Sequence, residues 1–153
     1  MTDAKEVDVA VRRAETGDAA ALADLMTQLG YSTRTSEMEM RMEAIFADKN
    51  YATFVAVSDG KVCGMIGTST RYVYEHNNVS AVIMALVVSY KMRGRGVGRA
   101  LVAAAENELA QKNVRRVAVY SRFERTEAHE FYESVGYKKN GFRLVKELPM
   151  PAD

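Results

Sequence analysis

The sequence has almost no cysteine or proline. Cys63 is the only cysteine, so an internal disulfide is excluded and nothing in the cysteine usage points to export. Its apolar neighbours predict a small buried side chain rather than a reactive thiol. The two prolines, Pro149 and Pro151, stand at the end of the chain, and no repeat or low-complexity linker interrupts the rest. We therefore expect a single domain over residues 1–153.

The sequence also lacks an excess of charge of either sign. It has 21 Lys and Arg against 20 Asp and Glu, so no overall field attracts nucleic acid or an anionic membrane. No apolar run approaches the roughly twenty residues of a membrane span, and the first six residues carry no apolar signal region. With two histidines and no clustered acids, we expect no metal site. A cytoplasmic protein without nucleic-acid or membrane partners is expected, and the composition is compatible with a homodimer.

Hydrophobic periodicity predicts strands and helices in alternation. Strands are expected at residues 7–12, 53–57, 62–71, 81–88 and 117–120, and helices at 19–29, 36–47, 100–111 and 126–134. Asp18 is expected to cap the first helix and Gly30 to end it. Asn140-Gly141 predicts a closing hairpin with strands at 137–139 and 142–145. This order of elements predicts a mixed α/β sheet.

The most informative stretch is a basic, glycine-rich turn between strand 81–88 and the helix that begins near Gly98. Gly94, Gly96 and Gly98 allow the backbone to turn tightly and to approach a ligand closely. The start of the helix adds unpaired N–H groups and the positive end of its dipole, which favour an anion. Four cationic side chains surround this point: Lys91, Arg93, Arg95 and Arg99. The turn therefore predicts a pyrophosphate site, with a plain solvated turn as the alternative.

The spacing of the turn distinguishes between kinds of phosphate ligand. It lacks the third glycine of the dinucleotide fingerprint and the Gly-Lys-Ser/Thr ending of a nucleotide P-loop. It does match Arg/Gln-x-x-Gly-x-Gly/Ala, as Arg93-Gly94-Arg95-Gly96-Val97-Gly98 directly after a Leu-Val-Val strand. The turn thus resembles the acetyl-coenzyme A signature of the GNAT N-acetyltransferase superfamily.

A second segment carries the same resemblance. Residues 125–137 look like that superfamily's Asn-x-x-Ala-x-x-Phe-Tyr-Glu-x-x-Gly-Phe segment, with Arg125 where Asn is commoner. Residues 50–148 are most similar to the aminoalkylphosphonate N-acetyltransferases within it. The resemblance implies an α+β fold: a mixed, mostly antiparallel sheet of six to seven strands flanked by about four helices.

The resemblance also implies the chemistry and the residues that perform it. A primary amine of a small molecule would attack the thioester of acetyl-coenzyme A, with backbone groups of the splayed strand facing the cofactor and Tyr132 protonating the departing thiolate. An ordinary half-buried aromatic is the alternative for Tyr132. The implied cofactor-binding residues are Leu86, Val87, Val88, Arg93, Gly94, Arg95, Gly96, Val97, Gly98, Arg99 and Arg125.

One departure concerns the base that deprotonates the amine. Related enzymes carry acidic residues just before the Leu-Val-Val segment, where this chain has Val82-Ile83-Met84-Ala85. Glu75, His76, Tyr120 or a water chain could serve instead. A set of aromatic and sulfur-containing residues suggests a less acidic acceptor pocket, and each of them also suits core packing: Tyr31, Tyr72, Tyr74, Met38, Met40 and Met42.

Three functions are consistent with these patterns. The first is acetyl-coenzyme A-dependent N-acetyltransfer to a small amine. The second is a module that binds acetyl-coenzyme A without turnover, which the missing acids favour and the presence of Tyr132 opposes. The third, nucleic-acid binding through the arginine-rich turn, lacks interleaved aromatics and an overall positive charge.

Overall fold

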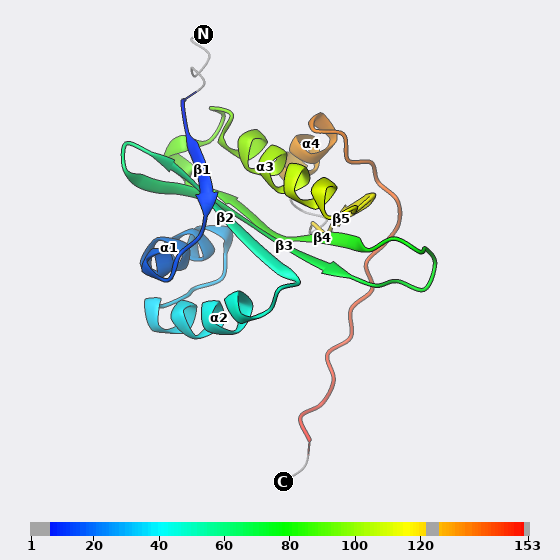
Figure 1. Ribbon diagram of the computed structural model, residues 1–153. Helices are drawn as coiled ribbons and strands as arrows, with labels where there is room; N and C mark the ends of the chain where they lie inside the picture. The colour runs from blue at the N-terminus through cyan, green and yellow to red at the C-terminus, as the bar shows by residue number, and fades with distance from the viewer. Residues whose placement is uncertain (1–6, 122–125, 152–153) are drawn as a thin grey trace. The chain divides into compact units, whose positions relative to one another are not determined.

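The structure is a computed structural model that describes residues 7–121 and 126–151 (Figure 1). Internal contacts divide the chain into two compact units, Met1–Val119 and Tyr120–Asp153. Arg125, one of the expected cofactor-binding residues, lies outside the described residues.

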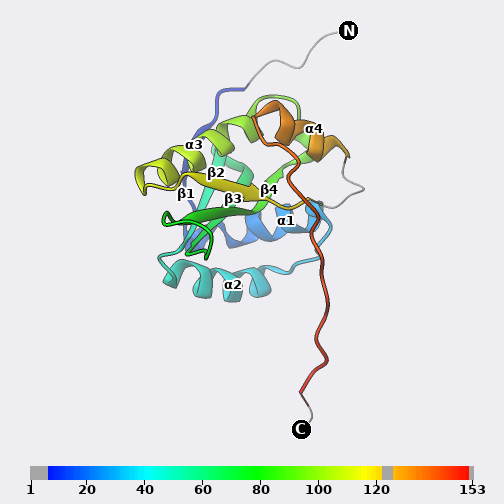
Figure 2. The same cartoon turned by 90° about the vertical axis from the view of Figure 1, so that its right-hand side faces the viewer.

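The larger unit is built on a five-stranded sheet in the order β1-β2-β3-β4-β5. The first four strands pair antiparallel, and β5 joins β4 in parallel. Helices α1 and α2 lie on one face of the sheet and α3 on the other, as the two views show (Figures 1 and 2). The strands are β1 (Ala10–Arg13), β2 (Tyr51–Ser58), β3 (Lys61–Arg71), β4 (Ser80–Val88) and β5 (Arg116–Val119), and the helices are α1 (Ala19–Leu29), α2 (Thr35–Ala47) and α3 (Val97–Gln111).

The first helix confirms its predicted bounds but not its predicted cap. Gly30 ends α1 in the left-handed region, with a φ of 116°. Asp18 stands at the N-cap, yet its carboxylate accepts hydrogen bonds from both terminal nitrogens of Arg12, at 2.8 and 2.9 Å, and from the Glu15 N–H. The Arg12 guanidinium holds the pKa of Asp18 below its usual range. Asp18 therefore ties β1 to the start of α1 instead of capping the helix.

Each face of the sheet has its own apolar core. On one face, residues of α1 and α2 pack against Val55, Met65 and Val87 of the strands. On the other face, α3 buries a stripe spaced by three and four residues: Val97, Leu101, Val102, Ala105 and Leu109. Both cores meet β4, so this strand is held in place from two sides.

Gly64 of β3 provides a test of the packing under α3. A Cβ at this position would lie 3.0 Å from Leu101 Cδ1, 3.1 Å from the Val87 carbonyl oxygen and 3.2 Å from Val97 Cγ1. Because Leu101 and Val97 are fully buried, we expect Gly64→Ala to cost about 1–3 kcal/mol of stability, as overpacking does. Thermal unfolding measures this directly. Gly67→Ala on the same strand meets no atom within 4 Å and should leave the midpoint unchanged or raise it. An equal midpoint shift in both variants would contradict the prediction.

The smaller unit contains α4 (Thr126–Ser134), with the predicted bounds. The ring of Tyr132 meets those of Phe131 and Tyr137 edge to face, with centroids 5.5 and 5.9 Å away. In the part of the chain that the structure describes, no helix has the length and apolar character needed to cross a membrane.

The predicted closing hairpin is wrong. Residues 137–139 and 142–145 are not strands, and Asn140 lacks the positive φ that a tight Asn-Gly hairpin turn requires. The side chains of Phe142 and Leu144 are 96% and 93% exposed, so the apolar positions of the segment bury nothing. A two-stranded hairpin without a packed face is marginal in water. The fold is therefore α+β with five strands and four α-helices among the described residues, instead of six to seven strands.

Candidate cofactor site

The site begins where β4 loses its neighbour β5. The two strands pair only over residues 80–83 of β4, because β5 ends at Val119 opposite Ile83. On the other side, Gly67 of β3 is opposite Ala85 while Thr68 is opposite Ile83, which leaves Met84 as the extra residue of a β-bulge. From Met84 onward, β4 pairs with β3 alone within the larger unit.

The direction of the backbone bonds determines what this free edge offers. The Ser89 N–H donates to the Cys63 carbonyl at 2.8 Å, so Ser89, Val87 and Ala85 direct their main-chain groups toward β3. Leu86 and Val88 alternate with them and face the free edge. The Val88 carbonyl accepts a hydrogen bond from Arg93 Nε at 3.1 Å. The edge therefore presents the N–H and C=O of Leu86 and the N–H of Val88, a pattern suited to an extended ligand that contains amides.

The three residues predicted for this strand thus have different roles. The main chain of Leu86 and Val88 borders the free edge. The main chain of Val87 pairs with Met65 of β3, and its side chain is buried in the core under α1 and α2. Val87 therefore positions the edge without contributing to it.

The glycine-rich turn lies at the end of this edge. Gly94 and Gly96 have φ values of 75° and 84°, in the left-handed region where glycine carries no penalty. The helix α3 begins at Val97, and its first internal bond runs from the Ala100 N–H to the Gly96 carbonyl at 3.0 Å. The N–H groups of the preceding residues, 97–99, have no partner inside the helix. A phosphate at this helix start would accept bonds from them.

The charged side chains of the turn itself are all cationic: Lys91, Arg93, Arg95 and Arg99. Among the described residues, none of its four cationic side chains has a carboxylate within 4.0 Å. Arg93 is fixed by its bond to the Val88 carbonyl, and the ammonium of Lys91 lies 5.8 Å from the centre of the Tyr90 ring. Arg93 is therefore in contact with the Val88 end of the free edge, and the cationic turn favours an anion such as a pyrophosphate.

The residues suggested for the acceptor pocket are divided between core and surface. Met38 and Met42 are buried between α2 and the sheet, so core packing accounts for both. Met40, Tyr72 and Tyr74 are exposed. The six residues proposed from the sequence do not line one pocket.

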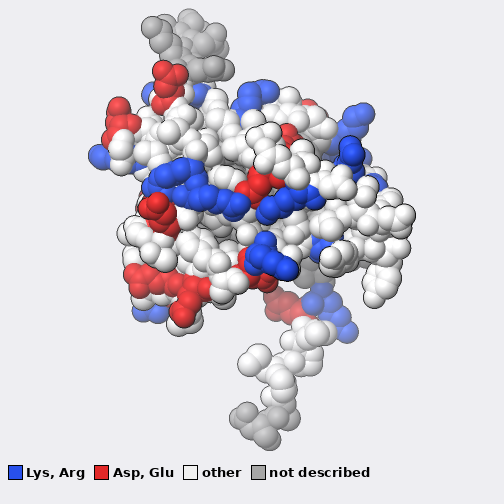
Figure 3. All heavy atoms as spheres, viewed as in Figure 1, with Lys and Arg blue, Asp and Glu red and all other residues white. Residues whose placement is uncertain are grey.

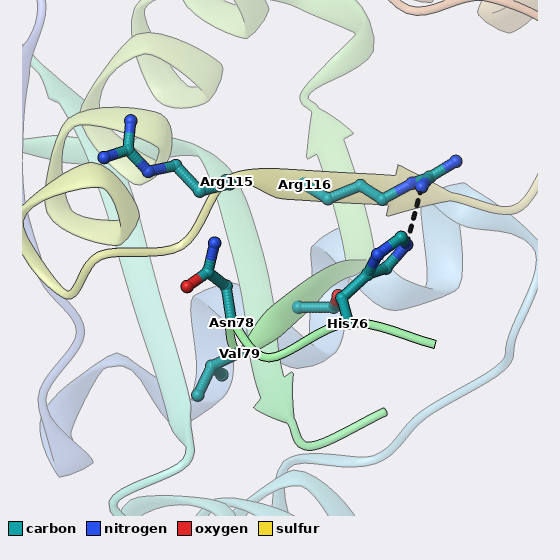
Figure 4. A pocket seen from close by; sticks show the side chains of 6 residues that line it. His76, Asn78, Val79, Arg115 and Arg116 are labelled. Atoms are coloured by element: carbon teal, nitrogen blue, oxygen red, sulfur yellow. Dashed lines mark hydrogen bonds between the residues drawn. The ribbon is translucent and has the colours of Figure 1, made fainter. Parts of the chain in front are cut away.

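His76, one of the candidate bases, lies near a cavity of about 300 Å³ at the other end of β4 (Figure 4). Arg116 Nη1 donates to His76 Nε2 at 2.9 Å, so this nitrogen is not free to accept a proton from a substrate. In Figure 4 the side chains of Arg115 and Arg116 point away from each other, and their guanidinium groups do not converge on a single anion. Ser80, the first residue of β4, lines the cavity, so about eight strand residues, roughly 26 Å, separate it from the glycine-rich turn.

Tyr132 and Tyr120 belong to the smaller unit. The hydroxyl-bearing ring of Tyr132 is packed against Phe131 and Tyr137, as described above, and the guanidinium of Arg143 lies 5.6 Å from the centre of the Tyr120 ring. Within the described residues, no group of three or more His, Cys, Asp or Glu could hold a metal ion.

Sequence reasoning missed two features of the site. Met84 stands at the bulge, where its side chain is 57% exposed although it belongs to an inner strand. Gln28 of α1 accepts a hydrogen bond from the Tyr90 N–H across 62 positions of sequence. Neither has a local signal, because a bulge depends on the partner strand and the Gln28 contact depends on the fold.

Comparison with solved structures identifies the class of fold. An aminoglycoside N-acetyltransferase in complex with CoA matches this chain with a TM-score of 0.82 and 20% sequence identity, covering 94% of this chain and 97% of that one. The free edge and the cationic turn therefore belong to a fold that acetyltransferases share.

The sequence comparisons identify the family. The profile described as "Acetyltransferase (GNAT) family" matches residues 19–137, and the chain belongs to this family, whose members use acetyl-CoA. The chain is 36% identical over 101 residues to an aminoalkylphosphonate N-acetyltransferase of Salmonella typhimurium, spanning 66% of either protein. It is 30% identical over 144 residues to an aminoglycoside N(6')-acetyltransferase type 1 of Stenotrophomonas maltophilia, spanning 92% of this chain and 93% of the relative.

Proposed function

We propose that the protein transfers the acetyl group of acetyl-CoA directly to a primary amine of a small molecule. The observation that carries this proposal is the free edge of β4, which leads straight into the cationic glycine-rich turn. An extended pantetheine arm would pair with Leu86 and Val88 while its pyrophosphate occupies the start of α3. Membership of the acetyltransferase family supports this arrangement.

The reaction requires one bond to form and one to break. The neutral amine nitrogen attacks the thioester carbonyl carbon and the new C–N bond forms. The nitrogen then loses one proton to water, and the C–S bond breaks with the electron pair leaving on sulfur, which takes up a proton to give the free CoA thiol. Negative charge develops on the carbonyl oxygen, where a positioned N–H is worth about 2.7–4 kcal/mol. The Leu86 and Val88 N–H groups are the donors that the free edge supplies.

Tyr132 is our proposed general acid for the departing thiolate. Its place in the family-like segment of α4 supports this role. Arg125 is proposed as a further cofactor contact on the resemblance alone. A single acetyltransferase domain over residues 1–153 is also part of the proposal, and the family match supports it because the match runs from residue 19 to residue 137.

The substrate is proposed to be a small amine that carries a positive charge in solution. Two relatives are named for aminoalkylphosphonate and aminoglycoside acetylation, and both substrate types contain primary amines. Acidic side chains gather over α2, at the lower left of Figure 3; this helix contains Glu39 and Glu43, whereas its Glu37 is paired with Arg34 at 3.1 Å. A negative surface of this kind attracts cationic amines. A cytoplasmic location and a homodimer remain part of the proposal.

An assay of thiol release tests the function against the alternative of a binding module. Acetyl-CoA is incubated with a panel that contains an aminoalkylphosphonate, an aminoglycoside and simple alkylamines, and free CoA thiol is followed. We expect release above the no-amine rate with at least one primary amine. Binding of CoA in calorimetry without release by any amine would favour the non-catalytic module instead.

The pH dependence tests whether a side chain acts as base. Val82 and Ile83 are buried and Ala85 packs against the core, so Met84 is the exposed side chain of this group, and it cannot accept a proton. An ammonium with a pKa near 10.4 is neutral in only about one molecule in 2,500 at pH 7. We therefore expect kcat/KM to rise about tenfold per pH unit up to the pKa of the amine.

An added carboxylate at the bulge of β4 tests the same point. Met84→Glu places a carboxylate at the exposed bulge position and should add an inflection below the pKa of the amine, whereas Ala85→Glu would disturb the core. An inflection already present in the wild type, and lost on mutating Glu75, His76 or Tyr120, would show that the protein has its own base.

A further inference from the structure

The turn between β4 and α3 is held mainly by hydrogen bonds to segments distant in the sequence. Its short 3₁₀ segment, Tyr90–Met92, has one bond at its start, from the Met92 N–H to the Ser89 carbonyl at 2.8 Å. Two distant parts of the chain bond to its backbone. The Val7 N–H donates to the Arg95 carbonyl at 3.1 Å, and Gln28 Oε1 accepts from the Tyr90 N–H at 3.0 Å.

Of these two contacts, only the one with Gln28 involves a side chain. Gln28 lies one residue before the end of α1, on the face of the sheet opposite α3. Its other amide atom, Nε2, donates to Asp24 Oδ2 at 2.8 Å, one helical turn earlier. Asp24 thus fixes which amide atom faces the turn, because a flipped amide would place an N–H against the Tyr90 N–H.

The N–H group of Tyr90, which donates to Gln28, has no acceptor within its own helical segment. The first N–H groups of a helical segment have no partner within it, and Tyr90 is the first residue of this one. Gln28 supplies the missing acceptor. A glycine-rich turn loses much conformational freedom when it orders around a ligand, so fixing its first residue beforehand reduces the ordering that binding requires.

We propose that Gln28 is a positioning residue for the cofactor, holding the glycine-rich turn in its binding geometry from the opposite side of the sheet. The inference rests on the proposed binding of the CoA phosphates at this turn. The hydrogen bonds that join Asp24, Gln28 and Tyr90 also connect α1 with the proposed cofactor site. Gln28 contacts no reacting atom in this role, so its effect should fall on cofactor binding and not on the chemical step.

Calorimetry with CoA and steady-state kinetics test the role. Gln28→Met keeps the length of the side chain and removes the acceptor, and we expect it to raise the Kd for CoA and the KM for acetyl-CoA about three- to tenfold, as loss of one hydrogen bond does. The kcat should stay within twofold of the wild type, because the substitution leaves the acetyl end of the edge intact. Asp24→Ala should have a smaller effect in the same direction.

Gln111→Met is the matched control, since Gln111 is exposed at the end of α3. We expect it to leave both constants unchanged. If Gln28→Met fails to fold, Gln28→Asn, which is one methylene too short to reach Tyr90, gives the same comparison. Equal Kd values for the Gln28 variant and the wild type would overturn the inference, as would a loss confined to kcat. Absence of CoA binding by the wild type would instead overturn the proposed function.

Discussion

We expect Gly96→Asp to abolish binding of CoA while leaving the protein folded. Gly96 is the N-cap of α3 and has a φ of 84°, where a Cβ adds about 1–2 kcal/mol of backbone strain. The added carboxylate would lie at the helix start, where the dipole favours it in the free protein. There it would occupy the position proposed for the phosphates and repel them. We therefore expect the Kd for CoA to rise at least about a hundredfold, which removes roughly 2.7 kcal/mol of binding free energy.

Thermal unfolding with and without CoA measures this effect. A ligand that binds only the native state stabilises it by about 2.7 kcal/mol at a hundredfold excess over its Kd, so the wild type should gain several degrees. The variant should gain none. Gly17→Asp serves as control, because Gly17 has open space around it and lies in the segment before α1. Equal stabilisation of wild type and Gly96→Asp would refute the phosphate site.

Tyr132→Phe should lower kcat by about a hundredfold, because general acid catalysis typically contributes 10²- to 10⁴-fold. The substitution keeps the ring that packs against Phe131 and Tyr137 and removes only the hydroxyl. The affinity for CoA should therefore change by no more than a few-fold. Amines of different pKa should be affected alike, since the proton is delivered to the thiolate and not taken from the amine.

Single-turnover kinetics with thiol detection measure this loss at the chemical step. Tyr137→Phe is the matched control, since this tyrosine makes the same kind of edge contact in the same unit and has no proposed role in the reaction. We expect it to retain wild-type kcat. Unchanged turnover in Tyr132→Phe would reduce Tyr132 to a packing residue.

The regular elements of the larger unit could be predicted from the sequence because each has a strong local pattern. Gly30 and the apolar stripe of α1 define that helix, and the Ser58-Asp59-Gly60 turn places β2 and β3 as neighbours. The cationic turn could also be predicted from the sequence, because its glycines and arginines are contiguous. The closing hairpin could not be predicted in this way: Asn140-Gly141 favours a tight turn, but a turn signal does not supply the core that strands need.

The remaining features of the site depend on contacts between distant segments. Whether a backbone group of Leu86, Val87 or Val88 faces the free edge is decided by the register with β3, which shifts at the bulge that contains Met84. The length of β5 determines how far the edge extends. The bond from Tyr90 to Gln28 arises only once α1 has packed beneath the sheet. Such features follow from pairing and packing, which a local pattern does not contain.

The short parallel contact between β4 and β5 has a consequence for how this site tolerates mutation. The groups of Leu86 and Val88 that face the free edge are peptide atoms, which every amino acid carries, except that proline lacks the N–H. Exchanges among aliphatic residues at these two positions should therefore alter packing and leave recognition intact, whereas proline at either position would delete a donor. In a mutational scan of this strand, we expect nearly every substitution to change the stability of the protein and almost none to change its ligand specificity. The part of the molecule closest to the proposed acetyl group is thus among the least dependent on side-chain identity.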